Sequence, residues 1–304
     1  MHVLVTGATG FVGQEILRRL HGAGHSIGVL TRNSRSPRAR QAATRQGAEI
    51  RHGDVLDPPS LEGALAGAHA VIHLVGIISE AGRSTFENIL ARGTENVVAV
   101  AKWARVRRFV HMSAIGARPA ARSRYHLTKW AAEEMVRLSG LDWTIFRPSI
   151  IYGPGDGFVN LFAQMSRWSP LLPVMGSGRS RFQPVAVEDV AACFVKALGE
   201  PRAVGGTYDL CGTEVLTLEH ILDLILEVTR RKRGKLHIPW WLARCQAAVL
   251  ECVFARLLGR PPPLNHDQLI MLQEDNVGDP RPARELFGLK LGPFREGIAR
   301  YLKA

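Results

Sequence analysis

Cysteine is scarce in this sequence, and long apolar runs are missing. The four cysteines among 304 residues, Cys193, Cys211, Cys245 and Cys252, show no C-x-x-C spacing, which excludes the usual cysteine metal and redox motifs and favours a reducing compartment. No stretch reaches the about 18 uncharged apolar residues that a membrane-spanning helix needs. Because a first strand is expected from His2, no cleavable signal peptide is expected, and the sequence predicts a cytoplasmic protein.

Acidic residues are outnumbered by basic ones, 27 to 39, which gives a formal net charge of +12. Such a charge is typical of proteins that bind nucleic acid, anionic membranes or phosphate-rich ligands. The basic residues cluster at 32–45, 102–108 and 230–235, and no aromatic residues interleave with the last cluster as base stacking would require. We therefore expect no nucleic-acid partner and assign that cluster to the end of a helix, where cations suit the dipole.

A glycine-rich turn follows the first apolar segment. Residues 3–13 read Val-Leu-Val-Thr-Gly-Ala-Thr-Gly-Phe-Val-Gly, with Gly7, Gly10 and Gly13 between a strand and a helical stretch. Glycines without Cβ atoms let backbone amides approach a pyrophosphate, and a helix N-terminus adds free N–H groups. The spacing is G-x-x-G-x-x-G rather than G-x-G-x-x-G, but its position after an N-terminal strand indicates a dinucleotide site.

Strand and helix patterns alternate through the first half of the chain. Strands are predicted at 2–5, 26–31, 49–52, 70–74, 108–112 and 142–146, and helices at 11–20, 86–105 and 129–138. Right-handed βα crossovers wind such a series into a doubly wound parallel sheet, an α/β fold of the Rossmann type. We expect residues 1–152 to form this nucleotide-binding domain and residues 153–304 a smaller C-terminal substrate lobe, interleaved with it in one structural unit.

Tyr125 and Lys129 stand four residues apart at the start of a predicted helix, so their side chains share one face. A nearby ammonium favours the phenolate, so this pairing is expected to lower the tyrosine pKa from about 10 and to provide a general acid or base near neutral pH. The same spacing also occurs in ordinary surface helices; here it follows the fifth predicted strand.

Together these motifs resemble the short-chain dehydrogenase/reductase superfamily in its extended form, which includes NAD-dependent epimerases and dehydratases. The resemblance extends over nearly the whole chain and includes Asp54-Val55, Leu74-Val75-Gly76, Arg147-Pro148-Ser149 and the segments 152–155 and 183–190. It implies catalytic roles for Tyr125, Lys129 and Ser113. It implies cofactor contacts from Gly7, Thr9, Gly10, Phe11, Val12, Gly13, Asp54, Val55, Leu74, Val75, Gly76, Met112, Tyr125, Lys129 and Pro148.

Two positions depart from the family pattern. The proton-relay asparagine, three residues before a Gly-Thr pair, falls on Leu90, and Asn88 is offset by two residues. In the turn after the fifth strand, Ile115 takes a position that is often catalytic, which leaves Ser113 as the candidate serine. This incomplete set is similar to the atypical subgroup that contains the nucleotide-binding accessory subunit of respiratory complex I.

The second predicted strand ends in Thr31-Arg32-Asn33, where NAD enzymes usually carry a carboxylate that binds the ribose diol. The Arg32 guanidinium can pair with a 2′-phosphate, and Arg35 and Arg38 add positive charge nearby. The sequence therefore predicts NADP(H), with NAD(H) as second choice. The alternative is that these are solvated surface arginines.

Other features have plainer interpretations. His73, His111 and His126 have no carboxylates at ligand spacing, so we expect core or surface histidines and no metal site. The apolar helix predicted at 240–258 can cover the core, line a substrate entrance or rest on a membrane surface, and core cover is favoured.

The sequence thus predicts an NADPH-binding reductase of a carbonyl or quinone-like small molecule, in which Tyr125 transfers the proton. A second interpretation is a non-catalytic accessory or assembly subunit of a respiratory complex, peripheral to the inner face of the membrane. A sugar-nucleotide epimerase or dehydratase ranks third, because a dehydratase would carry acidic residues beside Tyr125, where this chain has Arg124 and His126. Substrate and oligomeric state stay open.

Overall fold

The computed structural model describes residues 1–303, with residues 256 and 257 described by their backbone alone. Its centre is a seven-stranded sheet in the order β11-β6-β5-β4-β1-β2-β3, in which every neighbouring pair is parallel. The expected doubly wound α/β fold is confirmed. The strands are β1 (His2–Thr6), β2 (Ser26–Thr31), β3 (Glu49–His52), β4 (Ala70–His73), β5 (Arg108–Met112), β6 (Asp142–Pro148) and β11 (Gly206–Leu210).

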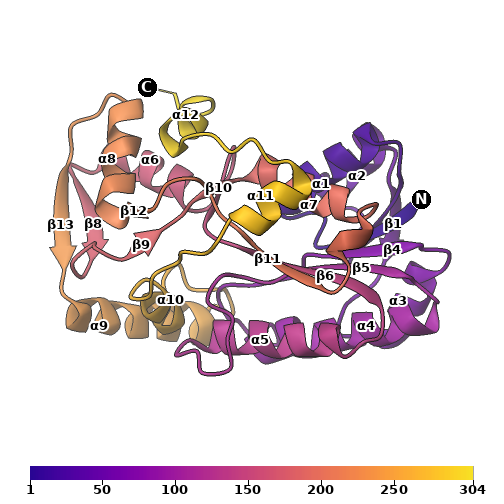
Figure 1. Cartoon of the computed structure of the whole chain (residues 1–304). Coiled ribbons are helices and arrows are strands. Elements are labelled where there is room, and N and C mark those ends of the chain that lie inside the picture. Colours follow the sequence, from indigo (N-terminus) through magenta and orange to yellow (C-terminus); the bar gives the residue numbers. More distant parts are fainter. Residues whose placement is uncertain (304) are drawn as a thin grey trace.

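Helices cover both faces of this sheet (Figure 1). One core packs strand residues such as Val5 against Ile16 and Phe194, and the other packs Phe109 against Val136. The first face carries α1 (Phe11–Gly22), α2 (Pro37–Gln46) and α7 (Val187–Ala197), and the second carries α3 (Pro58–Leu65), α4 (Gly93–Trp103) and α5 (Arg124–Arg137).

The strand order reverses between β1 and β4. Thr6, the last residue of β1, pairs with Leu30 on one side and His73 on the other. In open α/β sheets the loops on either side of such a reversal diverge, and the crevice outside the carboxyl ends of the strands binds the ligand. The glycine-rich turn and the loop after β4 both lie at this point.

Among the differences from the sequence expectations, two concern elements beside the site. The helices α2 and α3 were not expected, and α5 begins at Arg124 rather than at 129. β11 pairs with β6 and adds a seventh strand, although it comes after residue 153. Its Gly-Thr-Tyr-Asp-Leu sequence has little apolar alternation, so pairing with β6 rather than local pattern makes it a strand. The expected helix at 86–105 is divided into a π-helical segment, η1 (Glu87–Arg92), and α4, an irregularity that is frequent beside functional sites.

A smaller lobe lies beyond the carboxyl ends of the strands, on the left of Figure 1. Its core includes Leu172, Ile221 and Phe294. It contains the parallel pair β8 (Leu171–Met175) and β13 (Gly234–Ile238), with α6 (Val159–Trp168), α8 (Leu218–Val228) and α12 (Phe294–Ala299). Short elements connect it to the sheet: β7 (Ile151–Tyr152), β9 (Arg181–Phe182), β10 (Val185–Ala186), β12 (Leu216–Thr217) and α11 (Arg281–Phe287). The short helix η2 (Pro201–Ala203) precedes β11 at the other end of the sheet.

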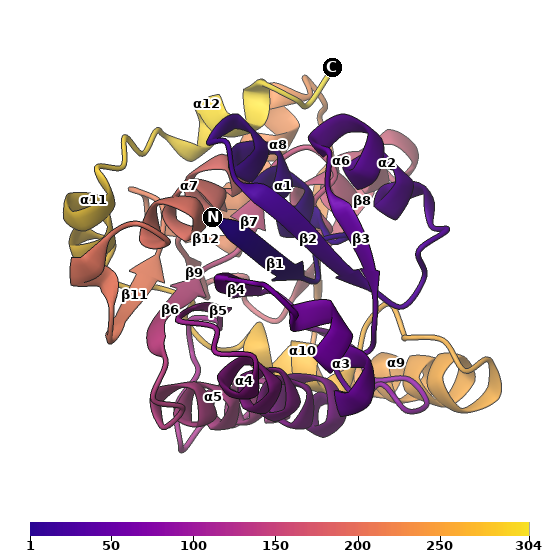
Figure 2. The same ribbon diagram turned by 90° about the vertical axis from the view of Figure 1, so that its right-hand side faces the viewer.

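Three further helical elements run along the lower edge of the molecule, α9 (Trp240–Leu250), η3 (Glu251–Leu257) and α10 (His266–Met271) (Figures 1 and 2). α9 turns Ala243 and Ala247 inward, whereas Trp241 and Val249 are 67% and 62% exposed. The expectation of core cover is therefore wrong for these large side chains, because alanines occupy the inward positions. Within residues 1–303, every helix is too short or too polar to cross a bilayer.

Candidate functional site

The glycine-rich turn at the end of β1 touches the loop that follows β4. Gly7 has a φ of +71°, and a Cβ atom there would stand 3.0 Å from the backbone of Leu74 and Val75. A Cβ atom at Gly13 would stand 2.5 Å from the Ala8 carbonyl oxygen, so α1 approaches β1 this closely only with glycine. The turn therefore requires glycine for its backbone path.

The first turn of α1 presents its backbone amides without a competing side chain. Gly10 precedes the helix, and its amide donates to the Gly7 carbonyl oxygen at 3.0 Å. Among the described residues no side chain caps this end, and the first turn carries no acidic residue. The amides of Phe11, Val12 and Gly13 are therefore available to an anion.

Arginine side chains gather beside this turn. Arg32 and Arg35 are exposed where β2 ends. The Arg38 guanidinium donates to the Thr9 carbonyl oxygen at 2.9 Å, which joins the start of α2 to the glycine-rich turn. A cationic surface thus lies next to the open amides of α1.

Asp54 and Val55 lie in the loop after β3. The Asp54 carboxylate accepts a hydrogen bond from the Leu56 amide at 3.0 Å, and Asn96 of α4 donates to the Val55 carbonyl oxygen at 2.9 Å. A Cβ atom at Gly93 would meet the Val55 side chain at 3.0 Å. This loop is thereby fixed against α4 at the same edge of the sheet.

Lys129 of α5 joins the ends of β4 and β5. Its side chain is buried, and its ammonium donates to the Met112 carbonyl oxygen at 2.8 Å. A Cβ atom at Gly76, in the loop after β4, would stand 3.5 Å from the Lys129 Nζ atom. Loss of hydration on burial lowers the pKa of Lys129 to about 8.

Tyr125 lies one turn before Lys129. Its ring packs edge-on against Phe86, with 5.8 Å between ring centroids, and it contacts the apolar cluster that contains Leu90. Burial, followed by the charge of Asp267, raises the pKa of Tyr125 to about 12. The expectation that Lys129 lowers this pKa is wrong for the chain alone, because lost hydration outweighs an ammonium that is bonded to a backbone carbonyl.

Ser113 follows β5, and its side chain is buried with no partner for Oγ among the described residues. Its amide donates to the Phe146 carbonyl oxygen at 2.7 Å, and the Ile115 amide donates to the Pro148 carbonyl oxygen at 3.1 Å. The loop therefore runs along the end of β6. A buried hydroxyl without a partner costs free energy, so a bound acceptor would stabilise this arrangement.

The family's relay position is apolar in three dimensions as well. Leu90 is 1% exposed and packs with Phe86. The Asn88 side-chain amide donates to the Arg83 carbonyl oxygen at 3.0 Å, in the loop before η1. Asn88 is thus engaged elsewhere and does not replace the relay asparagine.

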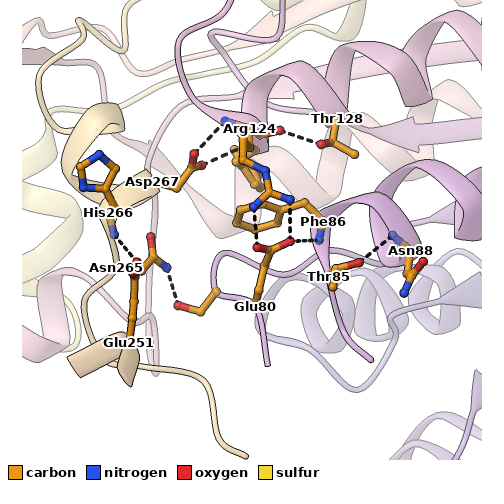
Figure 3. A network of polar contacts seen from close by, with 12 residues as sticks. Glu80, Thr85, Phe86, Asn88, Arg124, Thr128, Glu251, Asn265, His266 and Asp267 are labelled. Carbon is orange, nitrogen blue, oxygen red and sulfur yellow. Dashed lines mark hydrogen bonds and ion pairs between the residues drawn. The ribbon is translucent and has the colours of Figure 1, made fainter. Parts of the chain in front are cut away.

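A polar network from the C-terminal part of the chain holds the start of α5 (Figure 3). The Asp267 carboxylate of α10 accepts hydrogen bonds from the backbone amides of Arg124 and Tyr125 at 2.7 and 3.0 Å. Glu80 pairs with the Arg124 guanidinium at 3.0 Å and accepts from the Phe86 amide at 2.7 Å. Sequence reasoning missed both carboxylates, because no local motif marks them and Asp267 is 142 residues away from Tyr125.

Glu133 anchors α5 one turn after Lys129. Its buried carboxylate accepts two hydrogen bonds from Arg147 of β6, at 2.7 and 2.6 Å, and one from Arg137 at 2.6 Å. The helix that carries Tyr125 is therefore fixed at both ends.

The buried histidines belong to the core, as the sequence predicted. His73 and His111 lie in β4 and β5 with their rings stacked at 5.5 Å, and His126 is buried against Gly116. His73 bonds the hydroxyls of Thr6 and Thr94 across the sheet at 2.7 and 3.1 Å. In the part of the chain that is described, no group of three His, Cys, Asp or Glu side chains could hold a metal ion.

These features meet at the carboxyl edge of the sheet. Open amides and arginines suit a phosphate-bearing ligand, and a buried ammonium lies one helical turn after a phenol that keeps its proton at neutral pH. The arrangement can hold such a ligand and deliver a proton to an adjacent oxygen atom.

Comparison with known proteins shows the family of this chain. A model of the NAD dependent epimerase/dehydratase family matches residues 3–211. NADH dehydrogenase [ubiquinone] 1 alpha subcomplex subunit 9, mitochondrial, of Arabidopsis thaliana is 31% identical over 280 residues, which cover 90% of this chain and 70% of the relative. Ceramide reductase of Caulobacter vibrioides is 32% identical over 240 residues, which cover 78% of this chain and 70% of the relative. The chain spans about two thirds of the length of its subunit 9 relatives.

Solved structures share the fold over nearly the full length. UDP-glucose 4-epimerase of Thermus thermophilus, in complex with NAD, aligns with a TM-score of 0.75 over 98% of this chain and 97% of that chain, at 21% identity. The resemblance drawn from the motifs is thus confirmed, including the similarity to the complex I subunit.

Proposed function

The chain belongs to the NAD dependent epimerase/dehydratase family, and on that premise we propose that it binds NADPH and reduces the carbonyl group of a ketone or quinone-like molecule. The observation that carries this proposal is the placement of Lys129. Its buried ammonium is held 2.8 Å from the Met112 carbonyl oxygen, beside Gly76 and one turn after Tyr125. That geometry suits a ribose contact next to a proton donor.

The residues present fit a dinucleotide. The turn at Gly7 leaves no room for a Cβ atom, and the open amides of Phe11, Val12 and Gly13 face the place where a pyrophosphate would lie. Asp54 and Val55 would meet the adenine, and the loop of Leu74, Val75 and Gly76 would line the cofactor with Thr9, Met112 and Pro148.

Arg32 is the basis for choosing NADPH over NADH. It is exposed where β2 ends, and Arg38 already reaches the glycine-rich turn through Thr9. A guanidinium at this place pairs with a 2′-phosphate, whereas the carboxylate that usually selects NADH would repel it.

The chain's own residues would handle the proton. Bound NADPH supplies the hydride. Tyr125, which stays protonated at neutral pH, donates its proton to the carbonyl oxygen of the substrate, and the Lys129 ammonium stabilises the phenolate that this leaves. The Ser113 hydroxyl donates a hydrogen bond to the same oxygen. Leu90 leaves this chain without the family's relay side chain, so we expect slow turnover.

A second candidate function is a cofactor-holding accessory subunit of a respiratory complex. The buried Leu90 at the relay position and the similarity to the Arabidopsis NADH dehydrogenase subunit favour it. In that role NADPH would stabilise the fold without reaction, by an amount that grows with its concentration over Kd. We propose a cytoplasmic location for either function, at the inner face of the membrane for the accessory role.

Turnover measurements distinguish the two candidates. The purified chain is mixed with NADPH and a panel of quinones, ketones and enones, and oxidation of the nicotinamide is followed by absorbance. We expect turnover of at least one class and expect Tyr125→Phe to lower kcat by about 100-fold or more, because the proton donor is lost. NADPH affinity should stay nearly unchanged, because phenylalanine keeps the aromatic ring.

Tyr208→Phe is the matched control. It removes the same hydroxyl from β11, where that group donates to the Arg202 carbonyl oxygen, and should leave kcat unaffected. A fully active Tyr125→Phe variant would overturn the catalytic role. NADPH binding without turnover across the panel, together with stable co-purification with a membrane complex, would support the accessory role instead.

A further inference from the structure

The outward side of α9 and η3 is apolar, the reverse of what a surface helix of a soluble protein shows. We call it the α9 face and define it as Trp241, Leu242, Cys245, Val249, Cys252 and Val253. Its residues recur at helical spacing, and Trp241, Val249 and Val253 are 67%, 62% and 37% exposed. The inward positions hold the small side chains of Ala243 and Ala247. The large apolar side chains therefore point away from the rest of the chain and are exposed.

Basic residues outnumber acidic ones beside the α9 face. Arg244 and Arg260 are exposed, and Glu251 is the one acidic residue between positions 240 and 260. The Glu251 carboxylate is engaged, because it accepts a hydrogen bond from the His266 amide at 2.6 Å. We propose that the α9 face docks on the surface of an anionic lipid bilayer.

Charge and geometry favour a bilayer over a second copy of the chain. Two chains that each carry a formal charge of +12 repel, and self-pairing would set their basic residues against one another. α9 and η3 together extend over about 27 Å, and an amphipathic helix of this kind lies in the membrane interface rather than crossing it. Trp241 lies in the first turn of the helix and is exposed, and tryptophan is enriched at membrane interfaces.

Docking at this face places the functional site near the bilayer. α10 follows the α9 face, and its Asp267 binds the backbone of Tyr125 at 3.0 Å. Asn265 donates to the Ile78 carbonyl oxygen at 3.0 Å, and the Ile78 side chain is 57% exposed beside this contact. The docking proposal holds for either candidate function, because it depends on the surface alone.

Two cysteines make a direct test available without any substitution. Cys245 and Cys252 are exposed on the α9 face, whereas Cys193 and Cys211 are buried with their pKa values raised to about 12 by loss of hydration. A polarity-sensitive thiol dye should therefore label the α9 face selectively. We expect the dye emission to shift to the blue with phosphatidylglycerol-containing vesicles, more than with pure phosphatidylcholine vesicles, and less as salt is raised.

The unlabelled full chain is tested in parallel by vesicle flotation. The W241E/V249E variant should lower the partition coefficient on anionic vesicles by at least about tenfold. Trp168→Glu is the matched control, because Trp168 is 90% exposed at the end of α6, which lies on the upper side in Figures 1 and 2 while α9 lies on the lower side. It should bind vesicles like the wild type.

Three results would overturn the proposal. One is a labelled wild-type chain whose emission does not respond to anionic vesicles. Another is a W241E/V249E variant that floats with them as well as the wild type. The third is a wild-type dimer that this variant converts to monomer without any vesicle binding, which would assign the α9 face to self-association. An unchanged melting temperature and NADPH affinity establish that the variants are folded. If a variant fails to fold, the labelling test still decides, because it uses the wild-type chain.

Discussion

Lys129 and Tyr125 acquire their properties from burial, which favours the uncharged form of each. The pKa of Lys129 falls to about 8 and that of Tyr125 rises to about 12. Their four-residue spacing predicted that they share one face of α5, and they do. It could not show that the ammonium bonds the Met112 carbonyl oxygen, because that contact depends on how α5 packs over β5.

The lowered pKa of Lys129 predicts how stability depends on pH. The unfolded amine has a pKa of 10.5 and the folded one about 8, so between these values the unfolded chain binds more protons. The free energy of unfolding therefore rises with pH across this window, and the gain is lost as pH falls through about 8. The full difference is about 3 kcal/mol.

Urea unfolding of the cofactor-free wild type and of Lys129→Met at a series of pH values measures this effect. Methionine keeps the aliphatic stem without the titrating group. We expect the stability of the wild type relative to the variant to rise between pH 8 and pH 10.5. A difference that stays constant with pH would contradict the pKa of the buried amine.

The helices and strands differ in how far local sequence determines them. The glycine-rich turn, β1, β2 and α1 follow from apolar runs and Gly7, and the parallel order follows from repeated βα units. β11 and the outward face of α9 do not, because the first depends on pairing with β6 and the second on which side Ala243 and Ala247 pack. The carboxylate that caps α5 also comes from a distant helix, α10.

That distant cap makes Asp267→Ala informative. The Asp267 carboxylate accepts hydrogen bonds from the backbone amides of Arg124 and Tyr125 at the positive end of α5. Its loss should therefore lower the free energy of unfolding by about 2 kcal/mol. Asp223→Ala is the control, because its ion pair with Lys235 involves a 58% exposed carboxylate and is worth at most about 1 kcal/mol. Urea unfolding measures both, and equal losses would show that Asp267 is no more than a surface contact.

In the molecule as a whole, the candidate site residues lie at one edge of the sheet although they are far apart in the sequence. The turn at Gly7, the Arg32 strand end, the Leu74 loop and the Ser113 loop all follow parallel strands, so topology alone brings them together. The sequence could therefore predict that these loops lie at one edge of the sheet. The smaller lobe follows no such rule, because its packing depends on long-range contacts, and for that reason the sequence did not predict a substrate.

Both candidate functions require NADPH at the glycine-rich turn. Cofactor preference therefore tests most directly the claim that they share. Equilibrium titrations of the wild type, Arg32→Asp and Arg45→Asp with NADPH and NADH give the ratio of dissociation constants. Arg45 is the control, because it is exposed at the far end of α2. We predict that the wild type binds NADPH at least about tenfold more tightly than NADH, that Arg32→Asp abolishes this preference and that Arg45→Asp retains it. Equal dissociation constants in the wild type, or a ratio that Arg32→Asp leaves unchanged, would contradict the assignment.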